Sequence, residues 1–311
     1  IELPEVLIPL QVVLERFDLN NFTLEQETPI VVNHLGLEAR AGKHTVDVST
    51  LELDMPQVSA NLATKVELKD GYPLELSLDA LVKETDLAGQ KLSLKAQGSV
   101  AKLHLDSQFS ELIEAQLSGD IQPLEPTLPF DLLLEGGQAQ WPLTGKSDYQ
   151  AAIEKFKADG SLDGFNVQLK GKADGKEIPA LAIDLQGKGT TEQIELERLK
   201  LNTLGGELNG VVKANWKKLV NWQADVTLKD IQPGLQWPEA EGNISGSIVT
   251  SGELTEAGGW AIELPKLDIE GILREYPLDI EGQLSASDRS ASGEPKLKTS
   301  GLSLAHGVNS I

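Results

Sequence analysis

Residues 222–228 read Trp-Gln-Ala-Asp-Val-Thr-Leu, with an apolar side chain at every second position. Successive side chains of a β-strand point to opposite faces of a sheet, so this spacing predicts a strand with one apolar face and one wet face. The same alternation recurs in residues 74–78, 92–96 and 278–280. Because no long stretch has the 3.6-residue period of an amphipathic helix, the sequence predicts an all-β fold.

Turn dipeptides separate the alternating runs, at Asp70-Gly71, Asp159-Gly160, Asp174-Gly175 and Gly205-Gly206. Strands that follow one another without crossover helices pair mainly antiparallel. At about 8–12 residues for each strand and turn, the chain would hold roughly 25–30 strands. A continuous sheet of that size would measure about 120–140 Å, so we expect an elongated sheet that curls, splits or forms a solenoid.

An internal repeat of about 110 residues points to the solenoid-like option. The tetrapeptide Asp-Ile-Gln-Pro occupies residues 120–123 and again 230–233. Further along, a shift of 111 residues aligns apolar with apolar positions and glycine with glycine, roughly between 112–172 and 222–282. We therefore predict that residues 1–311 form one continuous elongated β segment with internal repeats and no separate globular domains.

The composition restricts the function further. The chain has 311 residues, of which 40% are hydrophobic and 24% charged, and its 50 leucines far outnumber its 14 aromatic residues. A Leu-rich apolar face is conformable and would suit alkyl chains. The net charge of −21 disfavours nucleic acid and anionic membrane surfaces as partners. The absence of cysteine excludes disulfides, thiolate catalysis and Cys-ligated metals.

No motif in the sequence predicts an enzyme, a metal site or a cofactor. The four histidines, His34, His44, His104 and His306, form no HxxxH pair, and we expect them on wet strand faces or in turns. Residues 159–164 resemble a calcium loop only faintly, because the stretch lacks the ligands that an EF-hand needs.

The sequence also predicts that the chain is an internal piece of a longer polypeptide. No run approaches the ~18 apolar residues of a membrane span. The first residue is Ile1 and no signal peptide is present, so we expect any targeting segment to lie outside this chain.

One block resembles a known family. Residues 199–210 read LKLNTLGGELNG and lead to Trp216 and Trp222, followed by the Asp-Ile-Gln-Pro turn and by EGNISG at residues 241–246. This succession resembles the TamB family of the AsmA-like superfamily. The strand-rich sequence on either side is compatible with a resemblance over the whole chain.

The resemblance implies both a fold and a function. TamB-like proteins are anchored in the inner membrane and cross the periplasm of Gram-negative bacteria. Their long sheet is curled into a U-shaped open groove, the β-taco, with a hydrophobic interior. The family is implicated in phospholipid transport between the membranes and in the assembly of autotransporters and other outer-membrane proteins. Its partner is TamA, an Omp85-type protein, and regions outside this chain would make that contact.

The expected function is therefore a periplasm-spanning lipid conduit whose working residues are its apolar lining. The predicted lining residues are Leu74, Leu76, Leu78, Leu92, Leu94, Ile183, Val226, Leu228, Leu264 and Ile280. Two alternatives remain open. An exposed sheet edge could bind strands of nascent outer-membrane proteins by β-augmentation, or the alternating faces could close into the filled core of a surface sandwich or adhesin-like rod.

Overall fold

The computed structural model describes residues 3–26, 29–307 and 309–310 of the chain. The chain consists of two units, unit 1 (Ile1–Leu162) and unit 2 (Asp163–Ile311). In the described residues the regular structure is β-strand, except for two short 3-10 turns, and the strands pair antiparallel. The predicted all-β, antiparallel class is therefore confirmed. Neither the continuity of the segment nor its repeat is tested by these observations, and both stay predictions.

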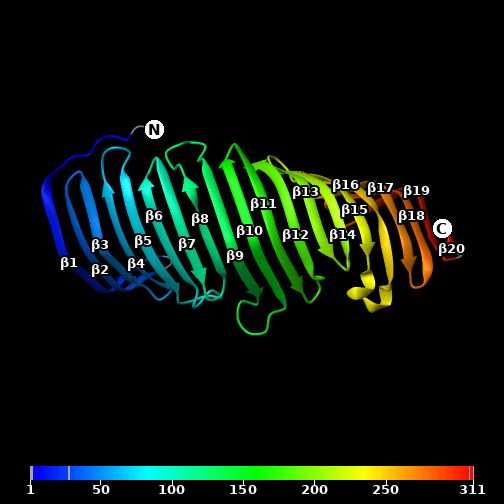
Figure 1. Ribbon diagram of the computed structural model, residues 1–311, viewed down its shortest axis with the longest axis horizontal. Coiled ribbons are helices and arrows are strands. Elements are labelled where there is room, and N and C mark those ends of the chain that lie inside the picture. Colours follow the sequence, from blue (N-terminus) through cyan, green and yellow to red (C-terminus); the bar gives the residue numbers. More distant parts are fainter. Residues whose placement is uncertain (1–2, 27–28, 308, 311) are drawn as a thin grey trace. The chain divides into compact units, whose positions relative to one another are not determined.

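Unit 1 is a meander in which each strand pairs with the next one along the chain (Figure 1). Its strands are β1 (Ile8–Leu24), β2 (Ile30–Lys43), β3 (Thr45–Asp54), β4 (Val58–Glu67), β5 (Pro73–Val82), β6 (Lys91–Ser99), β7 (Lys102–Ser110), β8 (Glu114–Ile121), β9 (Phe130–Trp141) and β10 (Tyr149–Ser161).

Unit 2 is also a meander of sequential antiparallel pairs. Its strands are β11 (Gly164–Gly175), β12 (Leu181–Thr190), β13 (Gln193–Thr203), β14 (Gly206–Asn215), β15 (Asn221–Ile231), β16 (Gly242–Leu254), β17 (Trp260–Leu273), β18 (Tyr276–Asp288), β19 (Lys296–His306) and β20 (Asn309–Ser310). The 3-10 turns η1 (Pro233–Leu235) and η2 (Pro238–Ala240) join β15 to β16.

The expected number of strands was wrong: the described residues form 20 strands, and β1 alone has 17 residues. Several glycines also lie inside strands without ending them. At Gly271 in β17, φ is +152°, and a Cβ atom would lie 2.1 Å from the carbonyl oxygen of Asn243 in β16. Only glycine allows such an approach of neighbouring backbones inside a strand.

The turn predictions had a mixed outcome. Asp70-Gly71 lies between β4 and β5, and Gly205-Gly206 lies where β13 gives way to β14, as predicted. The prediction of a hairpin turn at Asp159-Gly160 was wrong, because both residues belong to β10. Gly160 lies opposite Phe130 of β9, so the β9–β10 pairing continues past the turn-like dipeptide.

The pairing register keeps one apolar face and one polar face throughout each unit. In unit 1, Leu78 of β5 lies opposite Leu62 of β4 and Leu94 of β6. On the other face, Glu75 lies opposite Lys65 and Gln97. Because residues directly opposite each other share a face of the sheet, the alternation in each strand is aligned across its neighbours.

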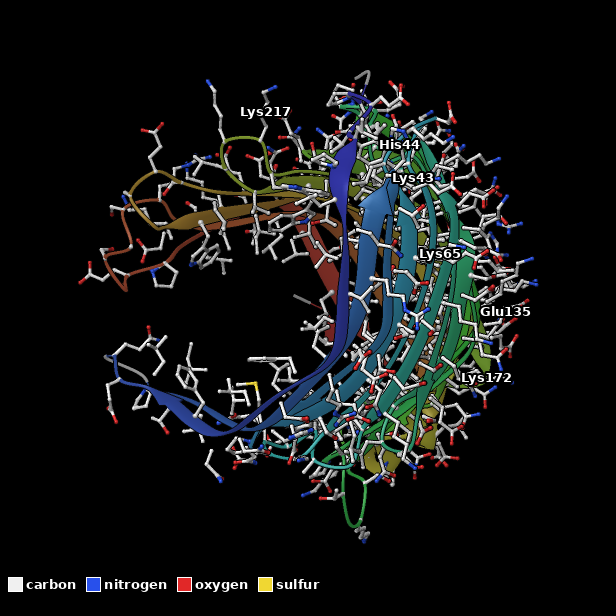
Figure 2. The ribbon with its side chains drawn as sticks, turned by 90° about the vertical axis from the view of Figure 1, so that its left-hand side faces the viewer. Lys43, His44, Lys65, Glu135, Lys172 and Lys217 are labelled. Carbon is white, nitrogen blue, oxygen red and sulfur yellow. The ribbon has the colours of Figure 1, made fainter. Side chains whose placement is uncertain are left out.

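The strands of unit 1 are bent, so that one face of its sheet is concave and the other is convex. Figure 2 shows β1 and β2 curving around an open concave side, with Lys65 and Glu135 on the convex side. The register places both of these residues on the polar face. The apolar face of unit 1 is therefore its concave face.

Candidate functional site: the apolar sheet faces

Five of the predicted lining residues lie together on the concave face of unit 1. Leu74, Leu76 and Leu78 come from β5, and Leu92 and Leu94 come from the neighbouring β6. All five are partly buried, whereas Glu75 and Lys95, which point the other way, are exposed. The register extends this apolar surface in both directions, for example through Leu62 of β4 and Phe109 of β7.

The other five predicted residues belong to the apolar face of unit 2, on four different strands. Ile183 lies in β12, Val226 and Leu228 lie in β15, Leu264 lies in β17 and Ile280 lies in β18. All are partly buried, and the oppositely oriented Thr227 is exposed. The structure thus gives two groups of five, one in each unit. Their role as a lipid lining stays a prediction.

Within the described residues of each unit, no second layer of secondary structure packs on the apolar face, and few side chains are fully buried. The buried apolar residues among the described ones are Ala96, Leu103, Ala115, Ala158, Val167, Ile231 and Ala261. The chain exposes 19301 Å² of surface. Two separate globular proteins of half its mass would together expose about 15,000 Å². A filled sandwich core, one of the open alternatives, would instead bury most large apolar side chains.

Glycines opposite large side chains are a feature of the apolar faces that the sequence pattern did not predict. Gly119 lies between Leu105 and Leu132 of the neighbouring strands. Trp222 lies directly against Gly252, where any Cβ atom would collide with the indole ring. The sequence alone does not show which glycine lies opposite which large side chain, because this depends on the pairing register of the strands.

A bulge in β17 keeps the apolar face intact where the alternation shifts. Leu264 lies opposite Leu284 and Leu267 lies opposite Gly282, so both leucines are on the apolar face although three positions separate them. Pro265 lies between them and has no N–H to donate to the sheet. Proline inside a strand is largely confined to edges and bulges, so this residue was the sequence signal for the shift.

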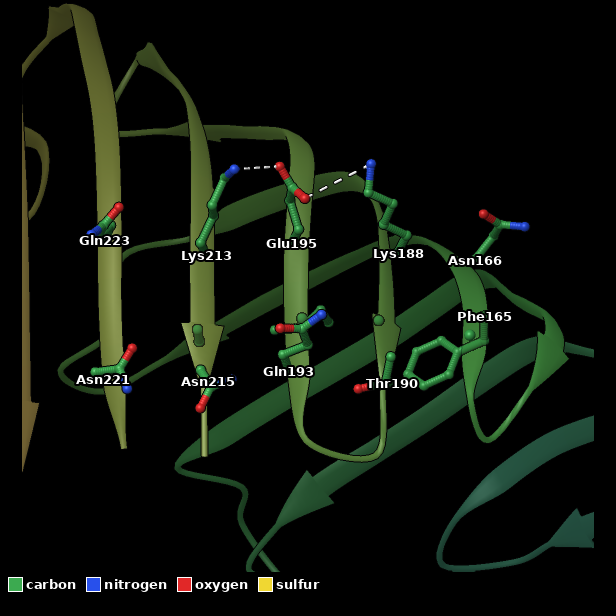
Figure 3. A pocket seen from close by; sticks show the side chains of 14 residues that line it. Phe165, Asn166, Lys188, Thr190, Gln193, Glu195, Lys213, Asn215, Asn221 and Gln223 are labelled. Atoms are coloured by element: carbon green, nitrogen blue, oxygen red, sulfur yellow. Dashed lines mark ion pairs between the residues drawn. The ribbon is translucent and has the colours of Figure 1, made fainter. Parts of the chain in front are cut away.

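The polar faces carry ion pairs that join neighbouring strands. Glu195 of β13 lies between Lys213 of β14 and Lys188 of β12, at 2.8 Å and 3.8 Å (Figure 3). Lys188 also reaches Glu197, at 2.7 Å. Glu195, Lys188 and Lys213 border a depression of about 610 Å³, together with Gln223 and Asn166. Because these pairs are exposed to solvent, the row supports strand pairing only modestly.

Two of the carboxylates with lowered pKa values lie in different surroundings. The Nδ1–H of His104 donates to Asp120 at 2.7 Å, and with Lys102 nearby it lowers the pKa of that carboxyl group. The backbone N–H groups of Ser292 and Gly293 donate to Asp288 at 2.8 and 2.6 Å and lower its pKa. Asp120 belongs to the polar face, and Asp288 stabilises the loop after β18.

The histidines serve local structure where the chain is described. His34 contacts Asn20 at 2.8 Å, His44 Nδ1–H donates to the Val6 carbonyl at 2.9 Å, and His306 donates to the Leu273 carbonyl at 2.8 Å. No group of three or more His, Asp or Glu side chains within the described residues is arranged to hold a metal ion.

The first strand differs from the others because it forms an edge of unit 1. In the described part of that unit, β1 pairs with β2 alone. Large apolar side chains along it are exposed, including Leu10 at 72%, Val12 at 55% and Phe17 at 44%. An exposed strand edge of this length can accept another strand.

Comparisons with known proteins agree with the fold and the sequence block. The family model described as TamB, N-terminal domain, matches residues 1–311. The translocation and assembly module subunit TamB of Haemophilus influenzae is 24% identical over 268 residues, which cover 82% of this chain and 20% of that protein. The chain thus spans about a fifth of the length of this relative. No solved structure matches. Within the described residues, no helix is long and apolar enough to cross a membrane.

Proposed function

The chain belongs to the TamB family over its whole length, and from this premise we propose that its apolar sheet faces are part of a path for phospholipid acyl chains between the inner and outer membranes. The observation that carries the proposal is an extensive apolar surface without a covering layer. Such a surface is costly in water, and it is retained where something apolar binds to it.

The energetics favour a continuous apolar surface over a specific binding site. Exposure of a methylene group to water costs about 0.8 kcal/mol, so an acyl chain of ~16 carbons crossing an aqueous space faces a barrier on the order of 10 kcal/mol. Partly buried leucines such as Leu76 and Leu94 would contact the acyl chain in place of water without binding it tightly. Weak, uniform contacts allow the lipid to move on.

We propose a periplasmic location for this segment, as part of a longer chain anchored in the inner membrane. The relative in Haemophilus influenzae is named as a subunit of a translocation and assembly module. By analogy, the full protein would support assembly of outer-membrane proteins, including autotransporters, with an Omp85-type partner of the TamA kind. Regions outside this chain would make that contact. The proposed role involves no catalysis and no cofactor.

Single-residue photo-crosslinking in cells tests the conduit. The photoreactive residue replaces Leu76, Leu94 or Val226 in the full-length protein, and the matched controls replace Glu75, Lys95 or Thr227. The first set is partly buried on the apolar faces, and each control is its exposed neighbour. We expect covalent phospholipid only in the first set. Equal labelling of both sets, or no lipid in either, would refute the proposal.

A β-augmentation scaffold is the second candidate, and the exposed edge of β1 supports it. Leu10 lies in a stretch where pairing between β1 and β2 is interrupted, between Ile8 and Val12. A Leu10→Pro substitution should therefore leave the β1–β2 pair largely intact while it disturbs the outer edge. Impaired assembly of an outer-membrane protein together with normal lipid crosslinking would favour the scaffold over the conduit.

A further inference from the structure

The positions of the cationic side chains bear on which part of a lipid the apolar faces could recognise. The register places every Lys and Arg within strands β3–β9 and β11–β19 on the polar face. Lys65 lies between Asp47 and Glu75, for example, and Lys213 lies between Glu195 and Gln223.

Selective recognition of an anionic phosphate group relies mainly on charged side chains or clustered backbone donors. Proteins bind phosphate with Arg and Lys side chains, or with free N–H groups at helix N-termini and glycine-rich loops. The backbone N–H groups of a strand lie in the plane of the sheet, along its ladders and edges, and do not point out of the apolar face. The apolar faces of these described strands therefore offer mainly apolar contacts and no Lys or Arg side chain for a phosphate.

Resting on the conduit function proposed above, we propose that the apolar faces bind acyl chains and do not select among phospholipids by head group. The head group stays in water, outside the apolar surface. Zwitterionic and anionic phospholipids should then occupy the surface in proportion to their abundance in the membrane that supplies them.

The test is the class composition of the captured lipid. The photoreactive residue is placed at Leu94 or Val226 in the full-length protein in cells, and covalently bound lipid is quantified by mass spectrometry. We expect phosphatidylethanolamine, phosphatidylglycerol and cardiolipin each within about twofold of their share in the same membranes. A tenfold enrichment of one class, about 1.4 kcal/mol of discrimination, would overturn the inference but leave the conduit standing. Absence of lipid at both positions would overturn both.

Two lysine variants test whether a cation added to an apolar face creates selection by head group. Ser107 lies on the apolar face, opposite Leu94 and Leu117, and Thr250 lies on the apolar face opposite Ala224. Ser107→Lys and Thr250→Lys should each enrich the captured lipid several-fold in anionic classes.

The matched controls put lysine on the polar face of the same strands, as Gln108→Lys and Ser251→Lys, and should leave the composition unchanged. The second pair, in the other unit, keeps the test informative if one substitution prevents folding. An unchanged composition in both apolar-face variants would refute the idea that the missing cations explain the lack of selection.

Discussion

Replacement of Gly271 by alanine should destabilise unit 2 by about 3–4 kcal/mol. The added Cβ atom would lie 2.1 Å from the carbonyl oxygen of Asn243 and 2.8 Å from the Cα atom of Ile244, both in β16. Relief of these contacts requires β16 and β17 to separate locally. The backbone strain costs about 1–3 kcal/mol, and each ladder hydrogen bond that is lost adds about 1 kcal/mol.

The matched control is Gly258→Ala, in the loop between β16 and β17. Its φ is +78°, but no atom lies within 4 Å of the position that an added Cβ atom would take. The cost there is only that of a left-handed alanine, about 1–2 kcal/mol. The difference between the two variants isolates the contact between strands from the effect of φ alone.

Urea unfolding followed by tryptophan fluorescence measures the difference. Four of the five tryptophans, Trp216, Trp222, Trp237 and Trp260, belong to unit 2, so the signal reports mainly on that unit. We expect the midpoint of Gly271→Ala to fall well below that of Gly258→Ala. Equal midpoints would show that the close approach of the backbones at Gly271 does not exclude a side chain there.

Three further predictions concern the two faces and one loop. Leu94→Arg should leave the circular dichroism of the protein unchanged and lower the total amount of lipid crosslinked at neighbouring apolar positions, because it replaces an apolar contact by a charge; an undiminished amount would contradict the apolar-path proposal. Glu195→Gln should lower the urea midpoint only slightly, through loss of the exposed Lys188 and Lys213 pairs; the difference should vanish in 1 M NaCl, where the screening length is about 3 Å, and a difference that survives would mean that the pairs act by packing. The pKa of Asp288 is lowered from 3.8 in the folded chain, so the stabilisation by this carboxylate is present above pH 3.8 and is lost as the pH falls through the folded pKa. Stability of Asp288→Asn should therefore fall less steeply with pH in that range. An unchanged pH dependence of unfolding would show that the loop does not depend on this carboxylate.

The face of each residue could be predicted from the sequence because it depends on strand geometry alone. Leu76 and Glu75 had to point to opposite sides once residues 74–78 formed a strand. The turn at Gly205-Gly206 followed from local backbone preference in the same way. By contrast, Asp159-Gly160 has the local preference of a turn, but the pairing of Gly160 with Phe130 overrides it. Pairing is a tertiary effect that one segment does not reveal.

The close approaches at strand glycines could not be predicted from any single strand. Gly119 is needed because Leu105 and Leu132 flank it and because the carbonyl of Asp131 approaches its Cα atom. Without the register, an isolated glycine in an alternating run indicates only a bulge or a close approach. The number of strands was overestimated because the assumed length of about 8–12 residues for each strand and turn is shorter than strands such as β1, which has 17 residues.

The sequential pairing of the strands has a kinetic consequence. In each unit every strand finds its partner in the segment that immediately precedes or follows it, as β5 does with β4 and β6. Loop closure between such neighbours is entropically cheap, and contacts of short sequence separation form fast. A unit of this kind can add hairpins one at a time as the polypeptide emerges, each new strand docking on a finished edge. Each new edge would then be exposed only until the next strand docks on it, which shortens the time during which it could pair with another chain.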